Sequence, residues 1–356
     1  ASLEFINAYR DKNKLDEIHV FAKEPLLFYN RVMLPEYINK EKDWQAIQTG
    51  EQSELDRLNI VFHQGNAIEK INRTDKTIID QKGETHSYDK LILATGSRPM
   101  ITLKVPRNMK GIFGLRTRRD ADDISEYLKD GGRALIIGGG LLGLELADSL
   151  TSIGVEVHIV QRSSRLMRAQ LDEMGSQLLH EEIIERGINV IYNDEVCSFD
   201  GEEKLRTVTL KSGRVLNMDA LFFAAGIKAN TELGEQCELK FNHGLIVNDH
   251  MQSSDEDIFA IGEIAEHRRK TYGTTPAAQD QARVAADYLN GNIWSSYKQS
   301  LSFNILKIKD LQLCSLGITT KPAGDDYQEI VFIDRQMRYY KKCILHHDRL
   351  VGAILI

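Results

Sequence analysis

Short apolar runs alternate with amphipathic stretches along most of the chain, and this alternation predicts an α/β protein. The runs 90–94, 134–137 and 220–224 lack a polar face, as expected of strands buried on both sides of a parallel sheet. Apolar residues recur at helical spacing over 1–10 and 141–153, where we predict helices. Further strands are predicted at 18–21, 59–62, 155–160, 188–192 and 258–261, and further helices at 120–129, 170–186 and 276–289.

The order of these segments between residues 134 and 192 is strand, helix, strand, helix, strand, which predicts a doubly wound mononucleotide-binding unit. A meander is predicted over 67–80 and a hairpin over 208–217. Residues 95–99 are expected to form a turn that continues as neither helix nor strand. The last 60 or so residues hold short strands, including 330–333, 337–341 and 351–356, and predict a small α+β domain.

Length, charge and cysteine usage limit the function classes. A chain of 356 residues is too long for one ordinary core and predicts two or three domains. A net charge of −7 argues against a nucleic-acid partner, and no apolar run reaches the roughly 18 residues that would indicate a membrane-spanning helix. The four cysteines form no CxxC pair, so neither a metal site nor a disulfide scaffold is predicted. Free thiols indicate a cytoplasmic protein.

The strongest motif is Gly-Gly-Gly-Leu-Leu-Gly at 138–143, a GxGxxG that follows a predicted buried strand and opens a helix. Gly138 permits a tight turn, Gly140 lets the backbone approach a diphosphate, and Gly143 lets the helix pack on the strand. Leu141 and Leu142 begin the helix, whose free N–H groups and positive potential favour an anion. The motif predicts a dinucleotide-binding site.

Residues beside this motif bear on coenzyme choice. The second strand ends at Gln161, where an acidic residue would select NAD, and Arg162 and Arg165 follow it. The arginines either pair with a 2′-phosphate or lie on a solvated loop, so both NADH and NADPH stay open. Glu145 faces the nicotinamide or complements the helix N-terminus, and the sequence does not separate these roles.

Small residues end three other predicted strands. They are Ala94-Thr95-Gly96, Ala224-Ala225-Gly226 and Ile261-Gly262, which Glu263 follows. Small residues at the carboxyl ends of strands let backbone approach a ligand in the crevice of an open α/β sheet.

In this order the motifs resemble the FAD-dependent pyridine nucleotide oxidoreductases, which bind two dinucleotides. The segments 29–32, 138–145, 171–175 and 313–317 further resemble the flavoprotein portion of the NAD(P)H-dependent nitrite reductase large subunit. Rubredoxin and ferredoxin reductases are the next most similar group. The resemblance implies two doubly wound, Rossmann-like domains plus the small C-terminal domain: an FAD-binding domain at 1–104 and 227–296, an NAD(P)-binding domain at 105–226, and an α+β interface domain at 297–356.

The resemblance also implies residue roles. Glu24 would hold the adenosine ribose of FAD and Ala67 would contact adenine through its backbone. The remaining FAD contacts would be Arg31, Thr95, Gly96, Arg116, Gly262, Glu263, Thr275 and Pro276. Gly226 would flank the nicotinamide nucleotide, together with Gly138, Gly140, Leu141, Leu142, Gly143, Glu145, Gln161 and Arg162. No side-chain nucleophile is implied.

Several departures from the family pattern matter. Residues 26–37 contain no cysteine, which excludes dithiol chemistry, and Pro35-Glu36 stands where many ferredoxin reductases carry Ser-Lys. Cysteine clusters for siroheme or an iron–sulfur centre are absent from the sequence. In the family, a first strand and an FAD glycine motif would precede the residue that corresponds to Ala1. We expect this segment to be either truncated or unobserved. If it is unobserved, the flavin site is expected to be empty or disordered.

The implied reaction is hydride transfer from NAD(P)H to FAD, with electrons passing on to a separate acceptor of the iron–sulfur, siroheme or rubredoxin type. The first interpretation is an electron-input module like that of nitrite reductase. The alternatives are a stand-alone NAD(P)H:rubredoxin or ferredoxin reductase, and a non-enzymatic nucleotide-binding redox scaffold. The C-terminal domain is a candidate face for a homodimer or for docking a partner.

Overall fold

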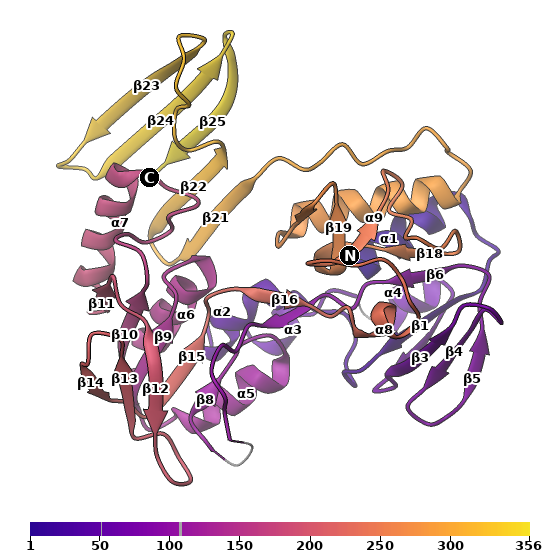
Figure 1. Cartoon of the computed structure of the whole chain (residues 1–356), viewed down its shortest axis with the longest axis horizontal. Helices are drawn as coiled ribbons and strands as arrows, with labels where there is room; N and C mark the ends of the chain where they lie inside the picture. The colour runs from indigo at the N-terminus through magenta and orange to yellow at the C-terminus, as the bar shows by residue number, and fades with distance from the viewer. Residues whose placement is uncertain (51, 107–108) are drawn as a thin grey trace. The chain divides into compact units, whose positions relative to one another are not determined.

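The computed structural model describes residues 1–50, 52–106 and 109–356, which divide into two compact units (Figure 1). The first unit contains 1–30, 48–98 and 227–300, and the second contains 31–47, 99–226 and 301–356. The second unit therefore joins the predicted NAD(P)-binding segment to the C-terminal region. It also includes residues 31–47 and 99–104, which our prediction assigns to the FAD-binding domain. Which nucleotide each unit binds stays a prediction at this point.

A five-stranded parallel sheet forms the centre of the second unit, in the order β11-β10-β9-β15-β8. Helix α6 packs on β10 and α7 packs on β11, so the predicted alternation of strands and helices is confirmed. Leu135 and Ile136 of β9 are completely buried, as the unbroken apolar run required. The elements are β8 (Ile112–Phe113), α5 (Arg118–Tyr127), β9 (Gly132–Ile137), α6 (Leu141–Ser152), β10 (Val155–Gln161), α7 (Glu173–Glu185), β11 (Asn189–Tyr192) and β15 (Ala220–Phe223).

Smaller elements surround this sheet. The predicted hairpin is present and is joined by a third strand, in the order β12-β13-β14. Helix α2 packs against α5 and α6, and the Tyr37 hydroxyl on α2 donates a hydrogen bond to Asp122 on α5 (2.8 Å). The elements are η1 (Arg31–Met33), α2 (Leu34–Ile38), α3 (Trp44–Ile47), β12 (Val196–Asp200), β13 (Thr207–Leu210) and β14 (Val215–Asn217).

The C-terminal region is a five-stranded antiparallel sheet in the order β21-β22-β25-β24-β23. Residues 301–356 are all described and contain no helix of their own, so the α part of the expected α+β domain comes from elsewhere in the unit. Helix α6 packs on β21, and Arg338 after β23 donates a hydrogen bond to Glu182 on α7 (3.0 Å). The strands are β21 (Phe303–Ile308), β22 (Leu311–Gly317), β23 (Tyr327–Asp334), β24 (Tyr339–His346) and β25 (Arg349–Leu355).

The first unit contains two separate parallel strand pairs, β1–β2 and β6–β18. Among the described residues, β1 and β6 each pair along one edge only. Helices α1 and α9 pack together, with an ion pair between Glu4 and Arg283 (2.7 Å). The elements are α1 (Ser2–Lys12), β1 (Ile18–Ala22), α4 (Gln52–Arg57), β2 (Ile60–Gln64), β6 (Leu91–Leu93), α8 (Glu232–Gln236), β18 (Ile258–Ala260), η2 (Gly262–Ile264) and α9 (Thr275–Leu289).

The other strands of this unit form small sheets. The predicted meander is confirmed and gains a third strand, in the order β3-β4-β5. Our expectation of a turn over 95–99 was wrong for its second half, because β7 pairs with β16 in a two-stranded sheet. Both strands of a two-stranded sheet are edge strands, and an edge strand tolerates a proline such as Pro99. The strands are β3 (Ile68–Asn72), β4 (Thr77–Asp80), β5 (Thr85–Ser87), β7 (Ser97–Pro99), β16 (Ile227–Ala229), β17 (Leu245–Val247), β19 (Ala265–His267) and β20 (Lys270–Thr271).

In the part of the chain that the structure describes, no helix is both long enough and apolar enough to cross a bilayer.

Candidate cofactor-binding sites

The glycine motif forms the turn between β9 and α6, where the sequence predicted it. Gly138 has φ +108° and donates its N–H to the Val160 carbonyl (2.9 Å), which ties the turn to β10. A Cβ on Gly143 would overlap the Gly138 carbonyl oxygen, so only glycine lets the helix approach the strand this closely. The local fold therefore depends on backbone geometry.

Space for a ligand remains at the start of α6. Gly140 is the N-cap, and no side chain caps the helix there. A Cβ on Gly140 would meet no atom within 4 Å. The N–H groups of Leu141, Leu142 and Gly143 precede the first intrahelical hydrogen bond, which Leu144 donates to Gly140 (3.0 Å). These donors and the open space fit a dinucleotide diphosphate.

Gln161 lies at the carboxyl end of β10, as predicted for the residue that reads the ribose. Its Oε1 accepts a hydrogen bond from the Gly139 N–H (2.8 Å), and its Nε2 donates to the Ser163 hydroxyl (2.6 Å). Gln161 therefore supports the glycine turn directly, a role that the sequence did not indicate. Arg162 is exposed on the loop that follows. The roles of Gln161 and Arg162 toward a nucleotide stay predictions.

The end of β15 lies beside the glycine turn. Ala224 donates its N–H to the Ile137 carbonyl (3.0 Å), and a Cβ on Gly138 would lie 3.0 Å from the Cα of Ala225. Gly226 follows with φ +121°. The structure thus brings Gly226 to the same edge of the sheet as Gly138, at the crevice where open α/β sheets bind ligands.

Glu145 is buried on α6, with 7% of its surface exposed. Its Oε1 accepts a hydrogen bond from the backbone N–H of Lys307 on β21 (3.0 Å). Burial raises the pKa of Glu145 to about 7 from an ordinary value of 4.5, and the negative charge of Glu36 acts in the same direction. The hydrogen bond from the Lys307 N–H and the positive charge of Lys307 oppose this shift, but burial outweighs them. The hydrogen bond to β21 is a structural role that neither of our two predictions included.

In the first unit, two predicted flavin motifs meet at one sheet edge. Strands β6 and β18 are parallel neighbours, with Leu93 opposite Ala260. Thr95 and Gly96 follow β6, and Gly262 and Glu263 follow β18. The Ser97 hydroxyl donates a hydrogen bond to Oε2 of Glu263 (2.9 Å), which links the two motifs directly.

Asn230, which no sequence motif indicates, holds this edge together through hydrogen bonds. Its Nδ2 donates to the Thr95 carbonyl (2.8 Å), its backbone N–H donates to the Gly96 carbonyl (2.9 Å), and its carbonyl accepts from the Thr95 hydroxyl (2.9 Å). Its Oδ1 accepts from Arg98 (2.7 Å). A lone asparagine 135 residues along the chain from Thr95 carries no signal that a sequence pattern could show.

Glu24 and Ala67 lie near the ends of β1 and β2. The Tyr29 hydroxyl donates to Oε2 of Glu24 (2.7 Å), and the Gly65 N–H donates to the Glu24 carbonyl (3.2 Å). The Ala67 carbonyl accepts from the Gln81 N–H (2.8 Å). Both residues are half-buried beside parallel strand ends, and their contacts with adenosine stay predictions.

Thr275 and Pro276 form the exposed first turn of α9, where Thr274 gives no side-chain cap. Deeper in this helix, Gln281 is completely buried and its Oε1 accepts from the Gly262 N–H (2.7 Å). The Nε2 of Gln281 has no hydrogen-bond partner among the described residues. A buried amide donor and an uncapped helix end both fit a ligand with hydrogen-bond acceptors, such as FAD.

The two predicted flavin-contacting arginines belong to the second unit. Arg31, in η1, donates from Nη1 to the Arg116 carbonyl (3.0 Å). The Arg116 N–H donates to Oδ2 of Asp120 at the start of α5 (3.0 Å). The structure thus brings these two residues together, and their contact with FAD stays a prediction.

Comparison with known proteins places these sites in a family. A model of the pyridine nucleotide-disulphide oxidoreductases matches residues 1–282, and a model of the rubredoxin NAD⁺ reductase C-terminal domain matches residues 303–356. The chain belongs to the pyridine nucleotide-disulphide oxidoreductase family. The proteins of this family are FAD-dependent enzymes that use NAD(P)H.

Individual relatives differ in length from this chain. The assimilatory nitrate reductase electron transfer subunit of Bacillus subtilis (strain 168) is 34% identical over 95% of this chain and 44% of the relative. The NADH-rubredoxin oxidoreductase of Clostridium acetobutylicum is 30% identical over 96% of this chain and 85% of the relative. Its crystal structure matches 99% of this chain and 88% of that chain, with a TM-score of 0.78 at 28% identity. The chain spans less than half of its nitrate and nitrite reductase relatives.

Proposed function

We propose that this chain takes a hydride from NAD(P)H onto FAD and passes the electrons to a separate acceptor, as the electron-input module of a nitrite-reductase-like system. The observation that carries the proposal is the uncapped, open start of α6 at Gly140. The relatives named for nitrate and nitrite reduction support the acceptor class.

Each group of residues has a distinct task in this proposal. The N–H groups of Leu141, Leu142 and Gly143 bind the coenzyme diphosphate, while Gln161 holds the turn and contacts the ribose. Arg162 can pair with a 2′-phosphate. Position 161 carries a neutral glutamine, which does not repel a phosphate as a carboxylate would, so both NADH and NADPH are accepted. When bound, FAD supplies the hydride-accepting chemistry.

The flavin-side residues orient their ligand rather than react with it. Thr95 and Gly96 present backbone at the end of β6, and Glu263 accepts hydrogen bonds from ribityl hydroxyls. Thr275 and Pro276 direct the N-terminus of α9 toward the pole of the flavin where negative charge develops on reduction. Glu24 binds the adenosine ribose and Ala67 contacts adenine, while Arg31 and Arg116 complete the FAD contacts.

Anaerobic mixing of the full-length, FAD-loaded protein with NADH or NADPH tests the proposal through loss of oxidised-flavin absorbance. The informative variant is Gly140→Asp. Asp is a favourable N-cap, so the helix should keep its stability, while the carboxylate occupies the diphosphate space. We expect flavin reduction at subsaturating NAD(P)H to slow by about 100-fold, about 2.7 kcal/mol of lost binding.

Gly140→Ala is the matched control and should change the rate far less, because it adds no charge. Chemical reduction with dithionite should bleach the flavin of all three proteins equally. Wild-type flavin that ignores both coenzymes, or a Gly140→Asp variant that reacts at the wild-type rate, would overturn the proposal.

A second acceptor class is favoured by one specific observation. The C-terminal sheet matches the rubredoxin NAD⁺ reductase C-terminal domain, and the rubredoxin-reducing relative is covered over 85% of its length. A stand-alone NAD(P)H:rubredoxin or ferredoxin reductase is therefore the alternative. Supplying the reduced protein with rubredoxin, or with a siroheme and iron–sulfur module, separates the two by which acceptor is reduced. We further infer a cytoplasmic location, where its free thiols stay reduced.

We also propose that two chains associate through β23, the edge strand of the C-terminal sheet. Ile330, Val331 and Phe332 are exposed by 58%, 48% and 54%, so this edge is apolar on both faces. An unprotected apolar edge strand pairs readily with a second copy of itself. Sedimentation of the wild-type protein should give a dimer and that of Val331→Lys a monomer. A monomeric wild type contradicts this proposal and leaves the electron-transfer proposal unaffected.

A further inference from the structure

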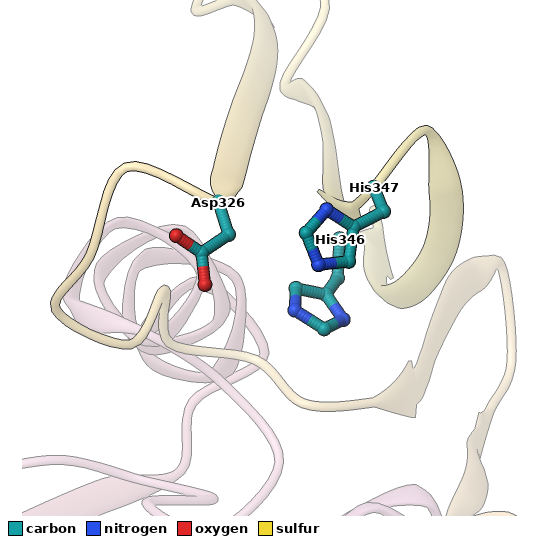
Figure 2. A group of neighbouring side chains, drawn as sticks. All are labelled: Asp326, His346 and His347. Atoms are coloured by element: carbon teal, nitrogen blue, oxygen red, sulfur yellow. The ribbon is translucent and has the colours of Figure 1, made fainter.

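Three potential metal ligands meet where β23 begins and β24 ends. Asp326 directly precedes β23, His346 is the last residue of β24, and His347 follows it. The ligand atoms of all three side chains lie within 4.8 Å of one another. Figure 2 shows the Asp326 carboxylate beside the two imidazole rings.

Backbone conformation explains how two adjacent histidines come together. Successive side chains of a strand point to opposite faces, so a regular strand would separate His346 from His347. The chain turns here instead: His347 and Asp348 link β24 to β25 with φ values of +47° and +60°. Such a two-residue turn normally contains Asn-Gly, and histidine is an unusual choice for it. The turn brings the two rings to a centroid separation of 4.3 Å.

Two further contacts hold the cluster in place. The His347 N–H donates to the Asp326 carbonyl (3.4 Å), which fastens the turn to the start of β23. The His346 ring stacks on Tyr327, its cross-strand neighbour, with a centroid separation of 4.4 Å. Tyr327 thereby fixes the orientation of one ligand. The carboxylates of Asp325 and Asp348 add negative charge close to the cluster in sequence.

The described residues offer a second histidine–carboxylate cluster for contrast, at Asp80, Glu84 and His86. There Asp80 is fully buried and already accepts four hydrogen bonds, from Asn66, His86 and the N–H groups of Lys82 and Glu84 (2.7–3.1 Å). Its acceptor capacity is used within the protein. No hydrogen bond or ion pair to another described side chain occupies the carboxylate of Asp326 or the ring nitrogens of His346 and His347.

We propose that Asp326, His346 and His347 bind one divalent transition-metal ion, with water completing its coordination. Two imidazoles and one carboxylate suit Zn²⁺, Co²⁺, Ni²⁺ or Fe²⁺, whereas Mg²⁺ and Ca²⁺ prefer all-oxygen sites. Metal–ligand bonds of about 2.0–2.2 Å require the three groups to move closer together, which rotation of the exposed Asp326 and His347 side chains allows. The sequence alone predicts no metal site here, because it contains no CxxC pair and two adjacent histidines follow no common metal-binding spacing.

Titration of the metal-free, full-length protein with Zn²⁺, and with Co²⁺ followed by its visible spectrum, tests the site. We expect one ion per chain and no competition from excess Mg²⁺. His347→Asn is the first variant, because asparagine tolerates the positive φ and removes only the imidazole. Asp326→Asn keeps the shape and removes the charge. Each variant, and His346→Ala, should weaken Zn²⁺ binding at least tenfold.

The exposed His243→Ala is the matched control and should leave the affinity unchanged, as should His86→Ala in the second cluster. A Zn²⁺ affinity that survives all three ligand variants overturns the proposal. Equal binding of Mg²⁺ or a thiolate-to-cobalt charge-transfer band does so too, because the ligands would then be different groups. Each outcome is independent of flavin reduction, so it does not depend on the proposed function.

Discussion

The two regions that we propose bind nucleotides hold the turns after their strands by different means. In the second unit, the turn after β9 depends mainly on its backbone: glycine conformations, close packing and N–H groups at the start of α6. One side chain, Gln161, adds a hydrogen bond from the Gly139 N–H. In the first unit, the turns after β6 and β18 are joined by side chains, through Ser97 to Glu263 and through Asn230 to Thr95. A backbone-built turn must be continuous in sequence, whereas a side-chain network can recruit residues from distant segments.

This difference predicts how each region responds to substitution. A glycine that permits close packing has no substitute, so a single added methyl group should disrupt the second unit. Removing one member of the side-chain network should loosen the first unit and leave its fold intact. The following predictions, in order of decreasing effect, test this contrast.

The largest effect is expected for Gly143→Ala. The new Cβ would overlap the Gly138 carbonyl oxygen, so either α6 or the turn must move. Overpacking against backbone should lower the free energy of unfolding by about 3 kcal/mol or more. Denaturant unfolding of both proteins measures this difference. Gly140→Ala is the control, since its Cβ meets no atom within 4 Å, and equal loss in both variants would show that packing at Gly143 is not the cause.

Glu145→Gln tests whether a buried side chain also controls the free energy of unfolding of the second unit. The pKa of Glu145 is raised by burial from an ordinary value of 4.5 to about 7. The folded state therefore holds a proton that the unfolded state releases, and stability falls as pH rises from 4.5 to about 7. Above pH 7 the ionised carboxylate costs about 3 kcal/mol. Glutamine avoids this cost and still accepts the Lys307 N–H.

Urea unfolding at pH 5 and pH 8.5 measures the effect. The variant should be about 3 kcal/mol more stable than wild type at pH 8.5, and much closer to it at pH 5. Glu156→Gln, at an exposed position on β10, controls for the loss of a surface charge. A constant difference between Glu145→Gln and wild type at both pH values would show that the carboxyl group does not titrate across this range.

The same contrast explains how much could be predicted from sequence. Four of the five strands in the second unit's parallel sheet, and the residues of its glycine turn, were predicted because apolar runs and glycine spacing are local signals. The two-residue edge strand β8 was not predicted, because it is too short to show a pattern. The sequence also predicted Thr95, Gly96, Gly262 and Glu263 at strand ends, which β6 and β18 bring together. It could not indicate Asn230, the buried Gln281 donor or the Lys307 contact of Glu145, because each depends on pairing between segments far apart in the chain. The pairing of β7 with β16 was missed for the same reason.

The smallest effect is expected for Asn230→Ala, which removes one hydrogen bond to Thr95 and one from Arg98. Each is worth about 1 kcal/mol, so the free energy of unfolding should fall by about 1–2 kcal/mol without loss of the fold. Asn230→Asp keeps the acceptor for Arg98 but replaces the donor to Thr95 with a carboxylate oxygen that repels the Thr95 carbonyl, so it directs the change at the bond that positions the predicted flavin turn. Both variants should retain FAD less tightly than the exposed control Asn217→Ala, as measured by flavin released on dilution. Unchanged FAD retention in both variants would mean that the Thr95–Gly96 turn keeps its geometry through its backbone alone. The turns of both units would then be held mainly by backbone.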